Sequence, residues 1–233
     1  MKSVLITGAN RGLGFAMAES FYQKGYRVYT VVRNDEAKAI IHQHFPESFV
    51  LIADVTDTDY QTRLQEFLAD KKLDVVINNA GSGGNRGVRT DLCTPEHLMT
   101  EFSSHCVGAL STVQGTLASL KHAEHPVVVN ISSRRGSLHM QSQGEAKQIR
   151  IALSYRIAKA AQNMLSLCMA DDLETDGIKV IVIHPGALLT DMAPPDADLT
   201  PKESAKRLLN LLESNAFSSR EFISLATRDR LPW

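Results

Sequence analysis

The sequence predicts a single α/β domain over residues 1–233, with a doubly wound parallel sheet of seven strands. Short β-branched runs alternate with longer segments of 3.6-residue apolar periodicity, an order that builds a parallel sheet with helices on both faces. Several strand runs are continuously apolar, as expected when both faces of a strand are covered. The length of 233 residues suits one large domain better than two.

The expected elements follow this alternation from the first residues to the last. Helical periodicity is clearest over residues 13–24 and 57–68, where apolar side chains recur on one face. The runs that predict strands are residues 4–7, 27–32, 49–53, 75–78, 127–131, 180–183 and 222–225.

Capping and helix-terminating residues at the ends of the segments agree with these elements. Thr200-Pro201-Lys202-Glu203 is a helix start with a capping box, and Gly25 and Gly177 stand where helices should stop before a strand. Three segments are expected to be irregular, and all follow a strand on the side where ligands bind in open α/β sheets. They are residues 82–91, 136–150 and 193–200.

Composition excludes several partners and sites. A formal net charge of -1, with 22% charged residues, gives no strong field of one sign, so neither nucleic acid nor a membrane surface is expected as a partner. Cys93, Cys106 and Cys168 form neither a disulfide framework nor a metal-ligand spacing, so no metal is expected. The N-terminal apolar run is too short for a signal peptide and breaks at Gly8, which predicts a cytoplasmic protein.

A glycine-rich loop, Thr7-Gly8-Ala9-Asn10-Arg11-Gly12-Leu13-Gly14, follows the first expected strand. Such a turn exposes backbone N–H groups at the positive end of a helix dipole, which suits a pyrophosphate. Gly8 would give the tight turn, Gly12 the close approach of a ligand, and Gly14 the close packing of helix on strand. A loop that serves chain geometry alone is the alternative, because glycines also mark turns without any ligand.

The loop resembles the cofactor loop of the short-chain dehydrogenase/reductase family, and further motifs follow in that family's order. Asp54-Val55 resembles the pair that meets the adenine, and Asn78-Asn79-Ala80-Gly81 the family's signature after the fourth strand. Tyr155-Arg156-Ile157-Ala158-Lys159 fits Tyr-x-x-x-Lys, and His184-Pro185-Gly186 with Thr190 fits the segment that closes over the nicotinamide. The resemblance covers essentially the whole chain and is nearest to the small sniffer and C-factor type carbonyl reductases. It implies a Rossmann fold and a nicotinamide cofactor.

The end of the second strand bears on which nicotinamide is bound. An acid there would bind a free ribose 2′-hydroxyl, whereas an arginine suits a 2′-phosphate. The strand ends at Arg33, and Asp35 and Glu36 are expected in the first turn of the next helix. Arg11 adds a second cation, so NADP(H) is the expected cofactor; an Arg33 that serves only solubility is the alternative. The expected cofactor-binding residues are Gly8, Asn10, Arg11, Gly12, Leu13, Gly14, Arg33, Asp54, Val55, Asn79, Ala80, Gly81, Tyr155, Lys159, Pro185, Gly186 and Thr190.

Tyr155 and Lys159 are four residues apart in a helical segment and so share one face. A nearby ammonium is expected to lower the pKa of a tyrosine from about 10. The resemblance implies that Tyr155 gives a proton to the carbonyl oxygen, Lys159 holds the nicotinamide ribose, and Ser133 hydrogen-bonds the substrate oxygen. Since Ser133 precedes Tyr155 by an unusually long stretch, residues 137–150 are expected to form an insertion beside the pocket.

His105 departs from the family pattern. The family carries Asn in an Asn-x-x-Gly step of the helix after the fourth strand, and this chain has His105-Cys106-Val107-Gly108. A histidine there either joins the catalytic group by relaying protons or is merely tolerated, and the sequence leaves both interpretations open.

These motifs predict an NADP(H)-dependent oxidoreductase that interconverts a carbonyl and an alcohol, acting on a small-molecule substrate. The alternative is an NADP(H)-binding regulatory or signalling protein of C-factor type, with little or no turnover. The resemblance also implies a homodimer formed through the helices that carry His105 and Tyr155. An apolar pattern fits that interface or the core equally well: Ile157, Ala161, Met164, Leu165 and Cys168.

Overall fold

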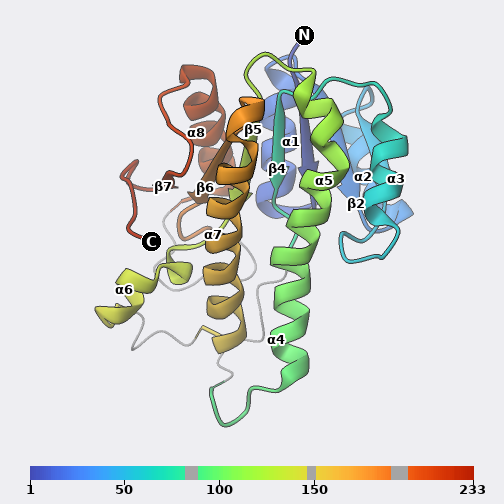
Figure 1. Cartoon of the computed structure of the whole chain (residues 1–233). Helices are drawn as coiled ribbons and strands as arrows, with labels where there is room; N and C mark the ends of the chain where they lie inside the picture. Colours follow the sequence, from blue (N-terminus) through green and yellow to red (C-terminus); the bar gives the residue numbers. More distant parts are fainter. Residues whose placement is uncertain (82–88, 146–150, 190–198) are drawn as a thin grey trace.

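A computed structural model describes residues 1–81, 89–145, 151–189 and 199–233 (Figure 1). It confirms the predicted fold class, with seven parallel strands in one sheet ordered β3-β2-β1-β4-β5-β6-β7. Each predicted strand is present, and no end differs by more than one residue. The strands are β1 (Ser3–Thr7), β2 (Arg27–Val32), β3 (Phe49–Ile52), β4 (Val75–Asn78), β5 (Val127–Ile131), β6 (Lys179–His184) and β7 (Phe222–Ser224).

Helices cover both faces of the sheet, and each face has its own apolar layer. Side chains alternate along a strand, so Val4 and Ile6 of β1 belong to one layer and Leu5 to the other. The first layer contains residues of α1 (Gly12–Gln23), α2 (Asp35–His44) and α8 (Pro201–Ser214). The second contains residues of α3 (Tyr60–Leu68), α5 (Gly108–Lys121) and α7 (Leu153–Leu173).

The strand order reverses between β1 and β4, and this reversal identifies the edge of the sheet at which a ligand would bind. The chain leaves β1 into α1 on one face, and after β4 it reaches α5 on the other. In a doubly wound sheet this divergence opens a crevice at the carboxyl ends of the two strands. The loops that follow β1 and β4 therefore meet at the same edge.

The long helix after β4 changes its winding at the position of His105. Helix α4 (Pro95–Phe102) begins at a capping box formed by Thr94 and His97, and it runs through a π-helical turn, η1 (Ser103–Val107), into α5 (Figure 1). π turns inside helices often occur at functional sites. His105 lies in the centre of this π turn.

The segment after β5 corrects one expectation. Residues 136–150 were expected to be irregular, but a 3₁₀ turn, η2 (Arg134–Gly136), is followed by a short helix, α6 (Leu138–Ser142). The Ser137 hydroxyl caps α6 by accepting the Met140 N–H at 3.1 Å, and the Trp233 carbonyl accepts the His139 N–H at 2.8 Å. Contact with the distant C-terminal residues thus helps to order a helix too short to form alone.

The structure modifies one further expectation, and two others concern residues that lie mostly outside the described ranges. The helix expected from residue 57 begins at Tyr60, because residues 57–59 form a turn. Most of the expected loops at 82–91 and 193–200 lie outside the described residues. Within the described ranges, no helix combines the length and apolar character needed to cross a bilayer.

Candidate active site

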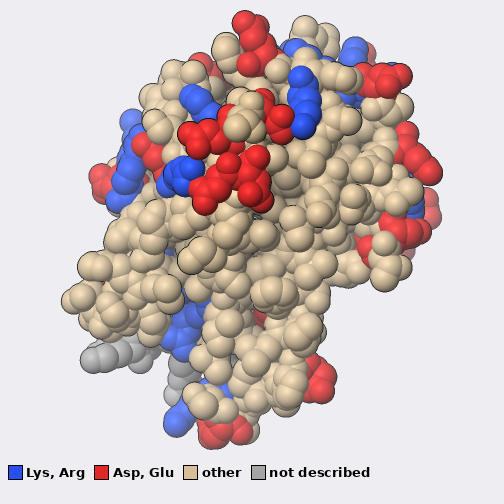
Figure 2. All heavy atoms as spheres, in the orientation of Figure 1, with Lys and Arg blue, Asp and Glu red and all other residues tan. Residues whose placement is uncertain are grey.

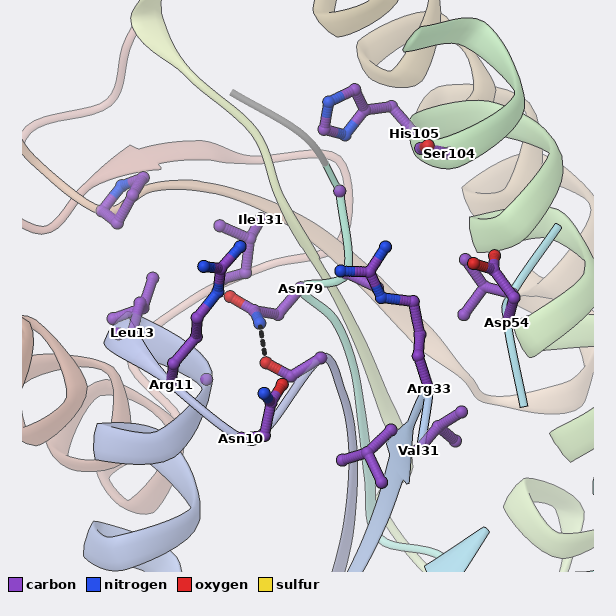
Figure 3. Close-up of a pocket in the computed structure, with 18 of the residues that line it drawn as sticks. Asn10, Arg11, Leu13, Val31, Arg33, Asp54, Asn79, Ser104, His105 and Ile131 are labelled. Atoms are coloured by element: carbon purple, nitrogen blue, oxygen red, sulfur yellow. Dashed lines mark hydrogen bonds between the residues drawn. The ribbon is translucent and has the colours of Figure 1, made fainter. Parts of the chain in front are cut away.

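A cavity of about 520 Å³ opens at the carboxyl edge of the sheet (Figure 3). The glycine loop, the ends of β2 and β4, the π turn and α7 contribute its walls. Fifteen of the seventeen expected cofactor-binding residues line it: Gly8, Asn10, Arg11, Gly12, Leu13, Gly14, Arg33, Asp54, Val55, Asn79, Ala80, Gly81, Tyr155, Lys159 and Pro185. His105, expected as a candidate catalytic residue, lines the cavity as well. The cavity also has lining residues that were not expected there: Val31, Val32, Ala53, Ser104, Ile131, Ser132 and Leu188.

Each of the three glycines in the loop has a different structural role. Gly8 has a φ of 68°, and a Cβ there would lie 3.0 Å from the Ala80 Cα. A Cβ at Gly14 would collide with the Gly8 carbonyl oxygen, so Gly14 allows helix α1 to pack on the loop. Gly12 has a φ of 55°, but a Cβ there would meet nothing within 4 Å. Open space therefore lies beside Gly12, at the start of α1, where a helix terminus favours an anion.

The loops after β1 and β4 are joined by four hydrogen bonds. The Thr7 hydroxyl accepts the backbone N–H groups of Asn79 at 3.0 Å and Ala80 at 2.9 Å. The Asn79 side-chain amide donates to the carbonyl oxygens of Thr7 at 2.9 Å and Gly8 at 3.1 Å. Figure 3 shows Asn79 in the cavity wall with one hydrogen bond from its side chain drawn as a dashed line. Asn79 therefore lines the cavity and also holds the glycine loop in shape.

Two exposed arginines extend into the cavity from different elements. Figure 3 shows Arg11 rising from the glycine loop and Arg33 from the end of β2. Asp35 and Glu36 lie in the first turn of α2, as expected, where the Asn34 side chain caps the helix by accepting the Ala37 N–H at 2.9 Å. The end of β2 therefore presents a cation rather than a carboxylate to the cavity.

Tyr155, Ser133 and Lys159 are brought together at the other side of the cavity. The Tyr155 phenol is hydrogen-bonded to the Ser133 hydroxyl. The Lys159 Nζ lies 5.7 Å from the centre of the Tyr155 ring, one helical turn further along α7. Ser133 does not itself line the cavity and reaches it through this contact with Tyr155.

Burial dominates the ionisation of both groups. It raises the pKa of Tyr155 to about 12, although the hydrogen bond from Ser133 acts in the opposite direction. The expectation that a neighbouring ammonium would lower this pKa is therefore wrong for the protein without ligand. Burial also lowers the pKa of Lys159 to about 7, although electrostatic interactions with Cys106 and Glu101 act to raise it.

The position of Lys159 depends on contacts that the sequence did not indicate. Its Nζ donates to the Ile131 carbonyl at 2.7 Å and to the Gln162 Oε1 at 2.9 Å. A Cβ at Gly136 would lie 2.7 Å from the carbonyl carbon of Lys159, so the turn after β5 presses directly on α7. Gln162 follows Lys159 by three residues. Because this spacing is common on any helix, the sequence gave no reason to expect Gln162 at the site.

His105 lies in the cavity wall beside Tyr155 and is paired with a residue that the sequence analysis missed. The rings of His105 and Tyr155 meet edge to face, with centres 5.7 Å apart. The His105 Nε2 lies 3.2 Å from the Oε2 of Glu101, and both residues are buried. The spacing of four residues was the available signal, but nothing local predicts that this glutamate is buried.

The segment after β6 is described only in part. Of the two residues expected here to contact the cofactor, Pro185 is among the described residues that line the cavity and Gly186 is not. Gly186 has a φ of 98°, and a Cβ there would lie 2.9 Å from Leu199 Cδ2, so the local turn requires glycine at this position. Thr190, expected to contact the cofactor, lies outside the described residues.

The fold and the cavity define a doubly wound α/β protein with a ligand site at the carboxyl edge of a parallel sheet. The chain belongs to the short chain dehydrogenase family, whose model matches residues 2–199. The expected family is therefore confirmed, and with it an oxidoreductase on a Rossmann-like fold.

Individual relatives agree with this membership. C-signal of Myxococcus xanthus is 32% identical over 162 residues, which are 69% of this chain and 93% of that protein. A 1-hydroxy-2-glutathionyl-2-methyl-3-butene dehydrogenase of Rhodococcus is 28% identical and covers 92% of both chains. The NADPH-bound carbonyl reductase from chicken fatty liver superposes with a TM-score of 0.87 at 28% identity, covering 100% of this chain and 99% of that one.

Proposed function

We propose that the protein interconverts a carbonyl and an alcohol with NADP(H), and that Ser133, Tyr155 and Lys159 perform its proton chemistry. The hydrogen bond between Tyr155 and Ser133 is the observation that carries this proposal, because it sets an acid beside a second hydroxyl at the cavity. The similarity to an NADPH-bound carbonyl reductase supports the same reaction class.

The residues of the cavity fit a dinucleotide phosphate. The open space beside Gly12 and the start of α1 would receive the pyrophosphate, and Arg11 and Arg33 the 2′-phosphate. Asp54 and Val55 would contact the adenine, and Lys159 the nicotinamide ribose. The bound cofactor would supply hydride transfer, which no side chain of the protein can provide.

Tyr155 is the acid of the proposed reaction. With a pKa of about 12 its phenol is protonated at neutral pH, so it has a proton to give to the substrate oxygen. Ser133 orients that oxygen with its hydroxyl. Lys159, whose pKa is about 7, carries substantial positive charge at neutral pH and stabilises the phenolate that Tyr155 leaves.

A regulatory role is the second candidate, favoured by the 32% identity to C-signal. The two candidates differ in turnover rather than in cofactor binding. NADPH oxidation against a panel of aldehydes, ketones and quinones separates them, with Tyr155→Phe as the control for background oxidation. Rapid oxidation that depends on Tyr155 supports an enzyme; tight NADPH binding without turnover on any carbonyl supports the regulatory candidate.

We further propose that two copies of the chain pair through α7 and the α4–α5 helix. Large apolar side chains are exposed on these helices: Met99, Phe102, Val107, Leu110, Ile157 and Met164. Figure 2 shows mainly uncharged atoms over the middle of α5 and α7. Sedimentation should find a dimer in the parent protein and a monomer in Met164→Glu; a parent that sediments as a monomer contradicts the proposal.

A further inference from the structure

A buried carboxylate stands behind His105, beyond the three residues of the proposed chemistry. Glu101 is 4% exposed, and its Oε2 lies 3.2 Å from the His105 Nε2. Glutamate is rarely buried to this extent without a partner, because removing a carboxylate from water is costly. The imidazole brings a ring nitrogen within ion-pair distance of that carboxylate.

The ring of His105 is confined on its other edge by the chain at Gly81. A Cβ at position 81 would overlap the His105 Cε1 and lie 2.6 Å from Nδ1, whereas Nε2 would be 3.2 Å away. The Nδ1–Cε1 edge therefore faces Gly81, and Nε2 faces Glu101. Tyr155 meets the same ring edge to face. These three contacts hold the imidazole in one orientation at the wall of the cavity (Figure 3).

We propose that Glu101 is a positioning residue for His105. At a separation of 3.2 Å the carboxylate would attract the Nε2–H and fix the tautomer in which Nδ1, on the Gly81 side, carries the lone pair. An imidazole held in this way can take a proton at Nδ1, and the carboxylate stabilises the imidazolium that forms.

The pair then has a defined task, which rests on the proposed function. In each reduction Tyr155 gives one proton to the substrate oxygen and must be protonated again. The His105 imidazolium gives up its Nδ1 proton to replace it and takes another from solvent. One proton enters and one leaves in each turnover, so the pair returns to its starting charge.

Other ionisable groups surround this pair and must be distinguished from it in any titration. Tyr155 and Lys159 face it from α7, Cys106 lies on the same π turn, and Arg33 extends from across the cavity (Figure 3). The field of Glu101 raises the pKa of both Tyr155 and Lys159. Because Lys159 titrates near neutral pH, turnover alone does not identify the histidine.

The test compares Glu101→Gln with Glu96→Gln, an exposed glutamate on the same helix. The first readout is the nitrogen chemical shifts of His105 in the protein without ligand, with His105→Asn used to identify its signals among eight histidines. We expect the Nε2–H tautomer in the parent and in Glu96→Gln, and a mixed or reversed tautomer in Glu101→Gln. An unchanged tautomer in Glu101→Gln overturns the proposal.

The second readout is turnover against pH. Glu101→Gln should keep the parent's NADPH affinity within about twofold but lose about 10- to 100-fold in turnover, the cost of removing a partner that orients a functional histidine. In this variant the fall in turnover at low pH should occur at a different pH from that in the parent. Glu101→Asp keeps the charge and should retain more turnover than Glu101→Gln; equal losses with the parent's pH profile would leave Glu101 a structural residue and overturn the proposal.

Failure of the proposed function is recognised separately. A parent protein that reduces no carbonyl contradicts the proposed oxidoreductase activity. The nitrogen shifts need neither cofactor nor substrate, so they still decide whether Glu101 fixes the tautomer of His105.

Discussion

The two arginines in the cavity make a prediction about cofactor choice. Arg33 directly follows β2, and neither it nor Arg11 forms an ion pair with another described residue. Both guanidiniums are therefore available for the 2′-phosphate that distinguishes NADPH from NADH. Replacing Arg33 by Gln removes one of the two cations and nearly preserves side-chain length.

The size of the effect follows from the exposure of the side chain. A hydrogen bond to a charged group is worth about 1.5–3 kcal/mol, and an exposed guanidinium belongs at the lower end of that range. Since about 1.4 kcal/mol is a factor of ten, Arg33→Gln should weaken NADPH binding about tenfold. NADH lacks the 2′-phosphate, so its affinity should change by no more than about twofold. Arg33→Asp adds repulsion and a ribose acceptor, and should narrow or reverse the preference.

Calorimetric titration with both cofactors measures this effect, at low and at high salt because screening weakens exposed charges. Arg27→Gln is the matched control, since Arg27 is also exposed and begins the same strand that Arg33 follows. It should bind both cofactors as the parent does. The reasoning is refuted if the parent binds NADPH and NADH equally, or if Arg33→Gln weakens both by the same factor.

Three further predictions concern buried ionisable groups. Tyr155→Phe should lower turnover about 10²- to 10⁴-fold while NADPH binding persists, and a variant with the parent's turnover would identify another proton donor. Lys159 has a folded pKa of about 7 against about 10.5 unfolded, so its contribution makes the free energy of unfolding rise between these pH values; urea unfolding at pH 7 and 9 should show a smaller rise in Lys159→Met. The pKa of His184 is lowered to about 3 by burial and by Arg134 and Arg135, so stability falls as pH drops below about 6.5. His184→Gln should lose less stability between pH 7 and 4.5, and an equal loss would contradict this cause.

The fold was predictable because its signals are local and repeated. Residues 75–78 and 127–131 are short apolar runs with clear ends, and each forms a central strand with those bounds. The glycine loop and the Tyr-x-x-x-Lys spacing likewise identified groups that the structure brings to one cavity. These features can be recognised without knowing what packs against them.

The missed features depend on contacts between distant residues. Helix α6 spans five residues, and its hydrogen bond from His139 to Trp233 joins positions that no local pattern connects. Glu101 has the sequence environment of a solvated helix residue, but it is buried on α4, a helix that packs against α7. Ser133 and Gly186, expected to contact substrate and cofactor, are not among the residues that line the cavity, and sequence order does not reveal which side of a turn faces the opening.

The hydrogen bonds between Thr7 and Asn79 have a consequence for how the protein acquires its ligand site. They join residues 72 positions apart, so the glycine loop reaches its final shape only after β4 has docked beside β1. A chain that ends after β3 has the whole glycine motif but lacks the side chain that holds it. Cofactor affinity is thus a property of the assembled sheet centre, and a bound dinucleotide would stabilise the pairing of β1 with β4 rather than the loop alone.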